Sequence, residues 1–577
     1  MIKPTSAQIL SASLVLVLGL GASTLSAQGN LDGGIGQNAG QDSGQNAGHI
    51  SGNVSMTMQT YSADSLIGAV VPPGKTGFNA FGNLIYTQGN FSAGLRYESY
   101  LNPVLGFPGR FHGTGVGYRF ARYTKGKFDV TIGNFYEQFG SGLLLRAYEQ
   151  RALGIDNALD GFRLIWRPID GLTLKGLYGK QRMDFDSGLI NGAGIVRAFD
   201  ADLDVNQLHS KWANAKTRVS LGGSFVSRFQ AGSTFLVDTL VLEVPQNVGG
   251  WGFRGALQHG GFQASFEYVK KINDPSAENL FTYREGEGLL VNLGWSKKGL
   301  GFLLSGKAVD NMSFRSDRNM LLFDLPINYM PAITKQHTYN LAATLYPYAT
   351  VAQGEVGWSA ELFYTLERGS KLGGKYGTKI SAQWATAFSL DTTNLTGLDG
   401  AVYGYERNSW MPGSELFIRD VNLEISRKLS RKLKAKYTYF HFDFNTLATP
   451  VTTDFKGIVN ADIHVAELGW RIKPKHSLRT EVQVLITEQD KGDWGTVVAE
   501  YTVSPHWFFS FMDQYNFGNE SVEKRVHYMY GILGYIEGAN RISMGFGKRR
   551  EGIFCIGGVC RAVPASNGFE ITFTSSF

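Results

Sequence analysis

Beyond its first 27 residues the chain contains no run that approaches 18 consecutive apolar residues. A helix that crosses a bilayer needs about 20 predominantly apolar residues to span the hydrocarbon core. The sequence therefore excludes a helical membrane protein as the mature form.

Motifs of the common enzyme classes are also missing. The sequence has no HExxH, no P-loop and no Cys/His cluster with metal-ligand spacing, and its ten His are scattered. His441 and Asp443 share one face of a strand-like segment, but a Ser that would complete a catalytic triad cannot be identified. We expect no catalytic residue, no metal and no cofactor, and the protein is not predicted to be an enzyme.

The net charge of the chain is only +6, and the charged residues are spread along the sequence. This argues against nucleic acid as a partner. The densest basic group surrounds a short turn, where we expect a solvated edge and keep a binding patch as the alternative. Its members are Arg427, Lys428, Arg431, Lys432, Lys434 and Lys436.

The N-terminus has the pattern of an export signal. Lys3 precedes a mostly apolar run from Ile9 to Leu20, and small residues lead to a cleavage site after Ala27. We predict a signal peptide over 1–27, with a retained anchor as the alternative. Residues 28–48 are rich in Gly, Gln and Asn, which is typical of a flexible linker too short and polar to fold as a plug.

The chain has only two Cys, Cys555 and Cys560, and they enclose Ile-Gly-Gly-Val. Gly-Gly between β-rich flanks is typical of a hairpin tip. Because exported proteins rarely keep free thiols, we predict a disulfide across this tip, and two unrelated thiols are the alternative.

Many segments of the sequence alternate apolar with polar residues at every second position. Val482, Val484 and Ile486 alternate with charged or polar residues that include Arg479 and Glu481. Charges in the middle of a strand are costly against lipid, so their face must be lined by protein or water. The composition, with 13% aromatic residues and 72 Gly, suits a membrane barrel whose aromatics form interfacial girdles. A soluble β-sandwich could share these patterns.

Turn lengths alternate between short and long along the chain, as they do in membrane barrels. Counting from both ends gives about 24 strands, with 22 to 26 allowed, over residues 49–577. The two counts meet at 312–355, which must be mainly one large outer loop or hold a short extra hairpin. Tyr437 and Tyr439 are followed by Phe440, Phe442 and Phe444, which suggests a bulge or an aromatic girdle.

The last nine residues alternate and end on an aromatic residue, with Phe573 and Phe577 on the apolar face. This end resembles the C-terminal signal of Gram-negative outer-membrane β-barrels. The resemblance implies an all-β transmembrane antiparallel barrel in the cell outer membrane, with membrane lipid and the barrel-assembly machinery as partners. The stretch 133–161 also resembles a segment of uncharacterised outer-membrane barrel families. The chain is not similar to receptors with a folded N-terminal plug.

Asp200, Asp202 and Asp204 alternate with apolar residues and project from one face of a strand. Three adjacent carboxylates repel one another unless cations compensate, so a Ca²⁺ ion or a cationic solute is one interpretation. The other is a lumen wall whose charge is balanced by Lys175, Lys180 or Arg residues of nearby strands. The second is favoured, because the Gly and Glu of a Ca²⁺ loop are missing.

Residues 143–153 lose the period of two, and we expect a short helix that carries Arg146, Glu149 and Arg151. A barrel of this strand count has a wide bore. We therefore expect this loop to form an inward constriction, with an outer cap as the alternative.

These features favour a porin-like channel for small hydrophilic solutes, selected by lumen charges and an inward loop. The alternative is a plugged barrel that serves as a scaffold or accessory subunit of an outer-membrane complex for secretion or assembly. Closed loops and lumen-filling side chains would favour the alternative, and a continuous wet channel would favour the first.

Overall fold

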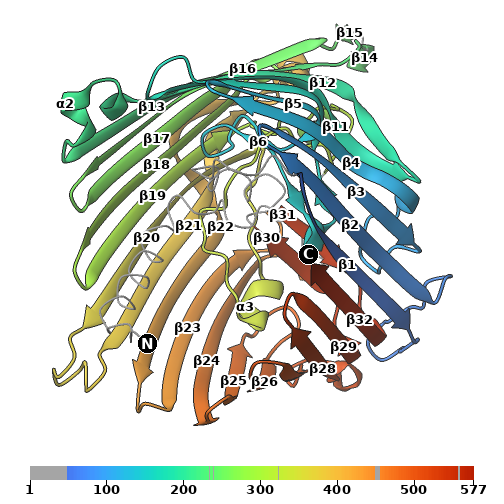
Figure 1. The fold of residues 1–577 in the computed structure, drawn as a ribbon, viewed down its shortest axis with the longest axis vertical. Coiled ribbons are helices and arrows are strands. Elements are labelled where there is room, and N and C mark those ends of the chain that lie inside the picture. The colour runs from blue at the N-terminus through green and yellow to red at the C-terminus, as the bar shows by residue number, and fades with distance from the viewer. Residues whose placement is uncertain (1–47, 233, 238–239, 322–323, 449–454, 557–558) are drawn as a thin grey trace.

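The computed structural model describes residues 48–577 except 233, 238–239, 322–323, 449–454 and 557–558. Twenty-four antiparallel strands form one sheet, and the first strand pairs with the last, so that the sheet closes into a barrel (Figure 1). The predicted fold class and the predicted number of strands are confirmed. The predicted signal peptide and all but the last residue of the predicted linker lie outside the described residues.

The first half of the barrel consists of β1 (His49–Tyr61), β2 (Thr76–Gln88), β3 (Phe91–Leu101), β4 (Phe111–Lys125), β5 (Phe128–Phe135), β10 (Leu159–Trp166), β11 (Leu172–Asp186), β12 (Leu189–Asp204), β13 (Thr217–Phe229), β16 (Asn247–His259), β17 (Phe262–Lys271) and β18 (Gly286–Lys297). The second half consists of β19 (Leu300–Asp310), β20 (Gly354–Leu366), β21 (Thr378–Asn394), β22 (Tyr405–Lys428), β23 (Leu433–Asn445), β24 (Ile458–Lys473), β25 (His476–Ile486), β26 (Trp494–Val503), β27 (Trp507–Tyr515), β28 (His527–Glu537), β29 (Asn540–Arg549) and β32 (Ser566–Ser576).

Short elements occupy the connections. The strands are β6 (Glu137–Gln138), β7 (Arg146–Ala147), β8 (Glu149–Gln150), β9 (Ile155–Asp156), β14 (Thr234–Val237), β15 (Leu240–Glu243), β30 (Gly552–Ile556) and β31 (Val559–Val563). The helices are α2 (Ser210–Ala213), α3 (Asn340–Thr344) and α4 (Gly397–Tyr403), with 3-10 turns η2 (Arg151–Leu153), η3 (Val205–Gln207), η4 (Ala277–Asn279) and η5 (Val522–Lys524). Among the described residues, none of the helices combines the length and the apolar composition needed to span a bilayer.

The alternation in the sequence places apolar side chains outside and polar side chains inside. On β25, Val482 and Ile486 are about half exposed on the outer surface, whereas Glu481 and Gln483 face inward and are buried. On β29, the outward Phe546 is 67% exposed. A closed barrel leaves no unpaired strand edge, which is what permits an apolar outer surface to face lipid.

The two ends of the barrel differ in their connections. At the turn end, where β1 begins and β32 ends, most links are tight, as at residues 89–90, 126–127 and 474–475. At the opposite end, the loop end, most connections are long. The largest, residues 311–353, joins β19 to β20 and carries α3. This stretch is a single large connection, as one of the two predicted possibilities had it, but its predicted outer position is wrong, because much of it packs inside the barrel.

Two connections enter the lumen: the first inward segment (136–158) and the second inward segment, whose described residues are 311–321 and 324–353. Figure 1 draws β6 and α3, which belong to them, within the ring of strands. Their apolar residues form two buried clusters with inward residues of the wall, one against β10–β19 and the other against β21–β26. The two largest buried hydrophobic clusters of the described residues therefore lie inside the barrel lumen.

Of the two explanations predicted for Tyr437–Phe444, a bulge or an aromatic girdle, the bulge is wrong. β23 pairs with β22 and β24 without a register shift, so Tyr437 stays outside while Phe440, Phe442 and Phe444 stay inside, at most 3% exposed. The aromatic residues change face because the second inward segment packs against this part of the wall, where Leu341 and Tyr346 join the same cluster.

Candidate functional site

The lumen is the candidate site, because both inward segments are held there by polar anchors as well as by apolar packing. The two segments also bind each other. The Arg146 amide donates to the Ile327 carbonyl at 2.8 Å, and the Tyr329 amide donates to the Gly142 carbonyl at 2.9 Å. Gly142 has φ +98°, a conformation that favours glycine, at the turn where the first segment reverses. We refer to the two segments together as the plug.

A buried charge cluster anchors the first inward segment to β3 and β11. Glu98 accepts from Arg96 Nε and Arg182 Nη2, both at 2.6 Å, and these three side chains are at most 1% exposed. The segment contributes Glu149 Oε1, 2.9 Å from Arg96 Nη1, and Asp156 Oδ2, 2.8 Å from Arg182 Nη1. Each charge has an opposite partner, which is the condition under which buried ions are tolerated.

Several neighbours complete this cluster. The hydroxyls of Tyr100 and Tyr136 donate to Glu98 and Asp156 at 2.8 and 2.9 Å. Gly117 of β4 leaves room for the Glu98 carboxylate, since a Cβ there would lie 2.2 Å from its carbon. Burial raises the pKa of Tyr136, which therefore stays a neutral donor.

The second inward segment has an anchor of the same kind on β19 and β20. Lys307 Nζ lies 2.6 Å from Glu355 Oε1, and both side chains are fully buried. The Tyr348 hydroxyl donates to Glu355 at 2.7 Å, and Lys307 also donates to the Pro331 carbonyl at 2.6 Å. Burial raises the pKa of Tyr348. On the far wall, the Leu341 amide donates to Gln483 of β25 at 3.0 Å.

The structure places the predicted constriction residues inside the barrel, but the expected helix over 143–153 is wrong. This tract forms β7, β8 and η2, because its backbone pairs within short hairpins: β6 pairs with β7 and β8 with β9. The Arg146 guanidinium stacks on the rings of Tyr148 and Tyr329, with centroid distances of 4.6 and 4.1 Å. Glu149 belongs to the buried charge cluster, and Arg151 binds Glu149 at 2.6 Å.

Asp200 and Asp202 share one cationic partner, whereas Asp204 caps a turn. Asp200 is buried, accepts from Ser224 at 2.6 Å and pairs with Arg254 Nη2 at 2.9 Å. Asp202 pairs with the same Arg254, whereas Asp204 caps η3 by accepting from the Asn206 amide at 3.0 Å. The balancing cation is thus an Arg of β16. Among the described residues no group of three His, Cys, Asp or Glu is arranged to hold a metal ion.

The two lysines suggested as balancing charges differ in position. Lys175 lies opposite Asp200 in the register of β11 and β12, and it binds Glu137 of the first inward segment at 3.0 Å. Lys180 is exposed like the outward Tyr178, on the opposite face of β11.

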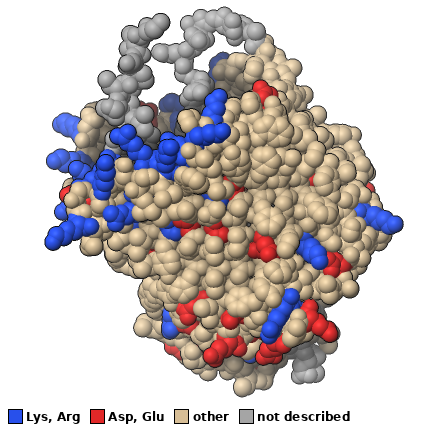
Figure 2. Space-filling model, turned by 90° about the horizontal axis from the view of Figure 1, so that it is seen from below, with Lys and Arg blue, Asp and Glu red and all other residues tan. Residues whose placement is uncertain are grey.

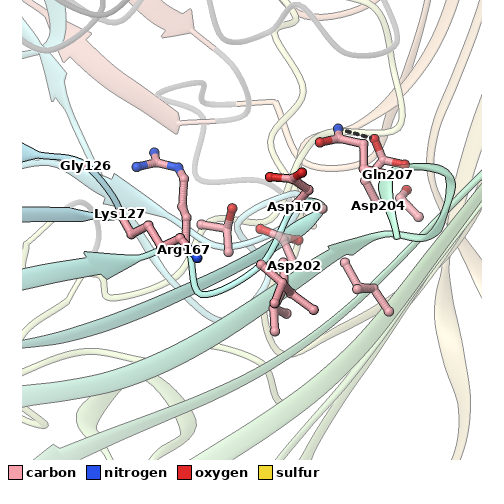
Figure 3. A pocket seen from close by; sticks show the side chains of 13 residues that line it. Gly126, Lys127, Arg167, Asp170, Asp202, Asp204 and Gln207 are labelled. Carbon is pink, nitrogen blue, oxygen red and sulfur yellow. Dashed lines mark hydrogen bonds between the residues drawn. The ribbon is translucent and has the colours of Figure 1, made fainter. Parts of the chain in front are cut away.

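A cavity of about 620 Å³ lies at the turn end of β5, β10, β11 and β12. Figure 3 shows Lys127 and Arg167 on one side of it, and Asp170, Asp202 and Asp204 on the other. Gln207 donates to Asp204 at 2.6 Å within the lining. The cavity therefore presents charges of both signs.

Phe573 and Phe577 lie where the barrel closes. Phe573 is paired with Met56 of β1. The amide and carbonyl of Phe577 both pair with Gly52 at 2.9 Å, and the Phe577 side chain is 67% exposed. The last residue therefore completes the seam between β32 and β1.

Cys555 and Cys560 face each other in the register of the β30–β31 hairpin, whose tip at 557–558 lies outside the described residues. The disulfide stays a prediction. β30 contacts α3 and η2, so this connection reaches the plug. Because it belongs to the loop end, an impermeant thiol reagent should label both Cys in reduced intact cells. A Cys introduced at Lys475, in a turn at the other end, should stay unlabelled, and the reverse pattern would invert the topology.

Sequence reasoning did not identify the buried charge cluster. The available signal was Arg96 and Glu98, two residues apart on one face of a strand, because opposite charges in mid-strand indicate a compensated interior. Asp156 and Arg182, which are distant in sequence, carried no such signal.

The family model that matches this sequence covers residues 8–577 and is described as a "Family of unknown function (DUF6029)". The chain belongs to this family. No curated protein matches the sequence.

Solved structures with a similar course of the chain are bacterial barrels. The siderophore receptor PirA from Pseudomonas aeruginosa has 11% identity and a TM-score of 0.38, with 92% of this chain and 81% of PirA covered. OpdK from the same organism, solved with vanillate, has 10% identity and a TM-score of 0.34, with 81% and 99% covered. OccAB2 from Acinetobacter baumannii has 9% identity and a TM-score of 0.34, with 92% and 98% covered. Similarity at this level carries no information about ligands.

Proposed function

We propose that the protein is an outer-membrane barrel whose lumen is closed by its own connections and that it acts as a scaffold or accessory subunit of an outer-membrane complex. The membrane location is supported by the apolar outer surface. Exposed aromatic residues such as Trp295, Trp470 and Trp507 lie near the turn end of their strands, where aromatic girdles of membrane barrels lie. The turn end then faces the periplasm.

The observation that carries the closed lumen is the anchoring of the plug to opposite walls. The first inward segment is fixed to β3 and β11 by the buried charge cluster. The second is fixed to β20 by the Tyr348 hydroxyl, which donates to Glu355, to β19 by the Pro331 carbonyl, which accepts from Lys307, and to β25 through Gln483. Between these anchors the plug packs apolar side chains against the wall. Such packing resembles a protein core and leaves little space for a hydrated solute.

A second candidate is the porin-like channel, and the cavity at the turn end favours it. A lumen mouth with Arg167 opposite Asp170 and Asp202 suits a small solute that carries charges of both signs. Passage would require the plug to leave at least one of its walls.

Conductance in planar bilayers decides between the two candidates. We expect the intact refolded barrel to be silent, and we expect discrete conductance steps from a variant in which a short Gly-Ser linker replaces residues 141–153. Heat-modifiable migration on gels verifies that both proteins are folded. Steady conductance of the intact barrel would contradict the closed lumen and support the channel.

A further inference from the structure

The turn end of β20–β25 carries unpaired positive charge, in contrast to the compensated charges of the lumen. Exposed Lys and Arg crowd three neighbouring turns and the strand ends beside them, and none of them forms an ion pair within the described part of the chain. We call them the basic rim: Arg368, Lys371, Lys375, Lys379, Arg427, Lys428, Arg431, Lys432, Lys434, Arg471, Lys473 and Lys475.

The turns of the basic rim lie side by side. Thr378 pairs with Arg427 across β21 and β22, and Lys428 pairs with Lys434 across β22 and β23. Glu367 is the acidic residue within these turns, whereas Glu424 nearby lies 3.8 Å from Lys436, inside the barrel. Figure 2 shows Lys and Arg gathered at one end of the visible face and mainly uncharged residues across its middle. Like charges held this close repel one another unless an anionic surface compensates them.

Apolar residues accompany these cations. Leu372 and Leu429, in the turns themselves, are 72% and 52% exposed. Trp470 on β24 and Tyr364 on β20 are exposed just above the turns. Cations interleaved with exposed leucines and bounded by aromatics are typical of the headgroup level of a bilayer. A soluble acidic partner would account for the charges but not for leucines placed next to the apolar belt.

We propose that the basic rim binds the headgroups of anionic phospholipids in the leaflet at the turn end. Phosphates there would accept from lysines of the turns, such as Lys371, Lys375 and Lys432, and from the guanidinium groups of Arg368, Arg427 and Arg431. The leucines and Trp470 would lie among the upper acyl chains. This inference rests on the proposed membrane location. It interprets the basic group as a binding patch instead of a purely solvated edge.

Lipid selectivity of the reconstituted full-length barrel tests the proposal. Spin-labelled phosphatidylglycerol and phosphatidylcholine are compared in phosphatidylcholine vesicles, and the motionally restricted fraction of each is measured. We expect the wild type to retain phosphatidylglycerol in excess at low salt and to lose the excess at high salt, because exposed charges are screened. The variant Lys371→Gln, Lys375→Gln, Arg427→Gln, Lys432→Gln should lose most of the excess.

A control at the loop end is Lys491→Gln with Lys524→Gln, compared with the rim double variant Lys371→Gln, Lys375→Gln, which removes the same number of charges. The loop-end control should keep the wild-type selectivity. Equal retention of the two lipids by the wild type would overturn the proposal, and so would unchanged selectivity of the rim variant. A rim-dependent association with an acidic periplasmic protein, without lipid selectivity, would assign the rim to that partner instead. Failure of the wild type to insert into vesicles would contradict the membrane location itself, whereas insertion without selectivity would contradict only the lipid site.

Discussion

Replacing Asp156 with Ala is expected to release the first inward segment from the lumen wall. This carboxylate belongs to the segment and pairs with both Arg96 and Arg182 of the wall, and its side chain is only 9% exposed. Its loss removes two ion pairs that join the segment to the wall. Removal of one partner from a buried ion pair costs about 3–5 kcal/mol. Since each 1.4 kcal/mol is a factor of ten, the released population should rise about a hundredfold or more.

Limited trypsin digestion measures this release. Arg146 and Arg151 are trypsin sites in the first inward segment, and they are shielded as long as this segment is packed in the lumen. Cleavage at these two sites in folded, detergent-solubilised barrel should be much faster in Asp156→Ala than in the wild type. The control is Glu551→Ala, which breaks an exposed pair with Lys491 that is worth at most about 1 kcal/mol. Equal cleavage rates in Asp156→Ala and the wild type, with both barrels folded, would show that the charge cluster does not hold the segment.

The fold could be predicted from sequence because a barrel wall is governed by local patterns. Period-two alternation sets the inward and outward faces, as in Val482 and Glu481, and turn lengths set the strand count. These signals need no knowledge of distant contacts. The same alternation misled at Phe440–Phe444, because apolar residues on both faces of β23 were interpreted as a bulge or an aromatic girdle. They indicate instead a lumen filled with protein.

The plug could be predicted only in part. Loss of alternation in 143–153 and the wide bore pointed to an inward loop, and its residues lie inside. The partners of those residues could not be predicted, because Glu149 meets Arg96 and Asn328 meets Leu143 across long stretches of chain. No sequence feature predicted that the second inward segment packs inside the barrel. Its position depends on contacts with Lys307 of β19 and Glu355 of β20. A long connection has the same kind of sequence whether it lies outside the barrel or within it.

Deletion of residues 566–577 is expected to abolish the barrel, the largest loss that a short truncation could cause. β32 pairs with both β1 and β29, from Asn53–Ser576 to Tyr61–Gly568 on one side and from Arg541–Thr574 to Arg549–Ser566 on the other. Without it two strand edges are unpaired, and each unsatisfied backbone group in hydrocarbon costs several kcal/mol. Heat-modifiable protein should then be absent from the outer membrane.

A milder variant isolates the terminal aromatic residue from the closing strand. In Phe577→Ala the two backbone hydrogen bonds to Gly52 can still form, so the seam itself is retained. If the assembly machinery reads the C-terminal side chain, the steady-state level of folded barrel should nevertheless fall several-fold. Phe546→Ala is the matched control, because Phe546 and Phe577 are both 67% exposed, but Phe546 lies within β29 and not at the C-terminus. Equal levels of folded barrel in the two variants would show that Phe577 contributes only apolar surface, and that closure of the sheet by β32 is sufficient for insertion.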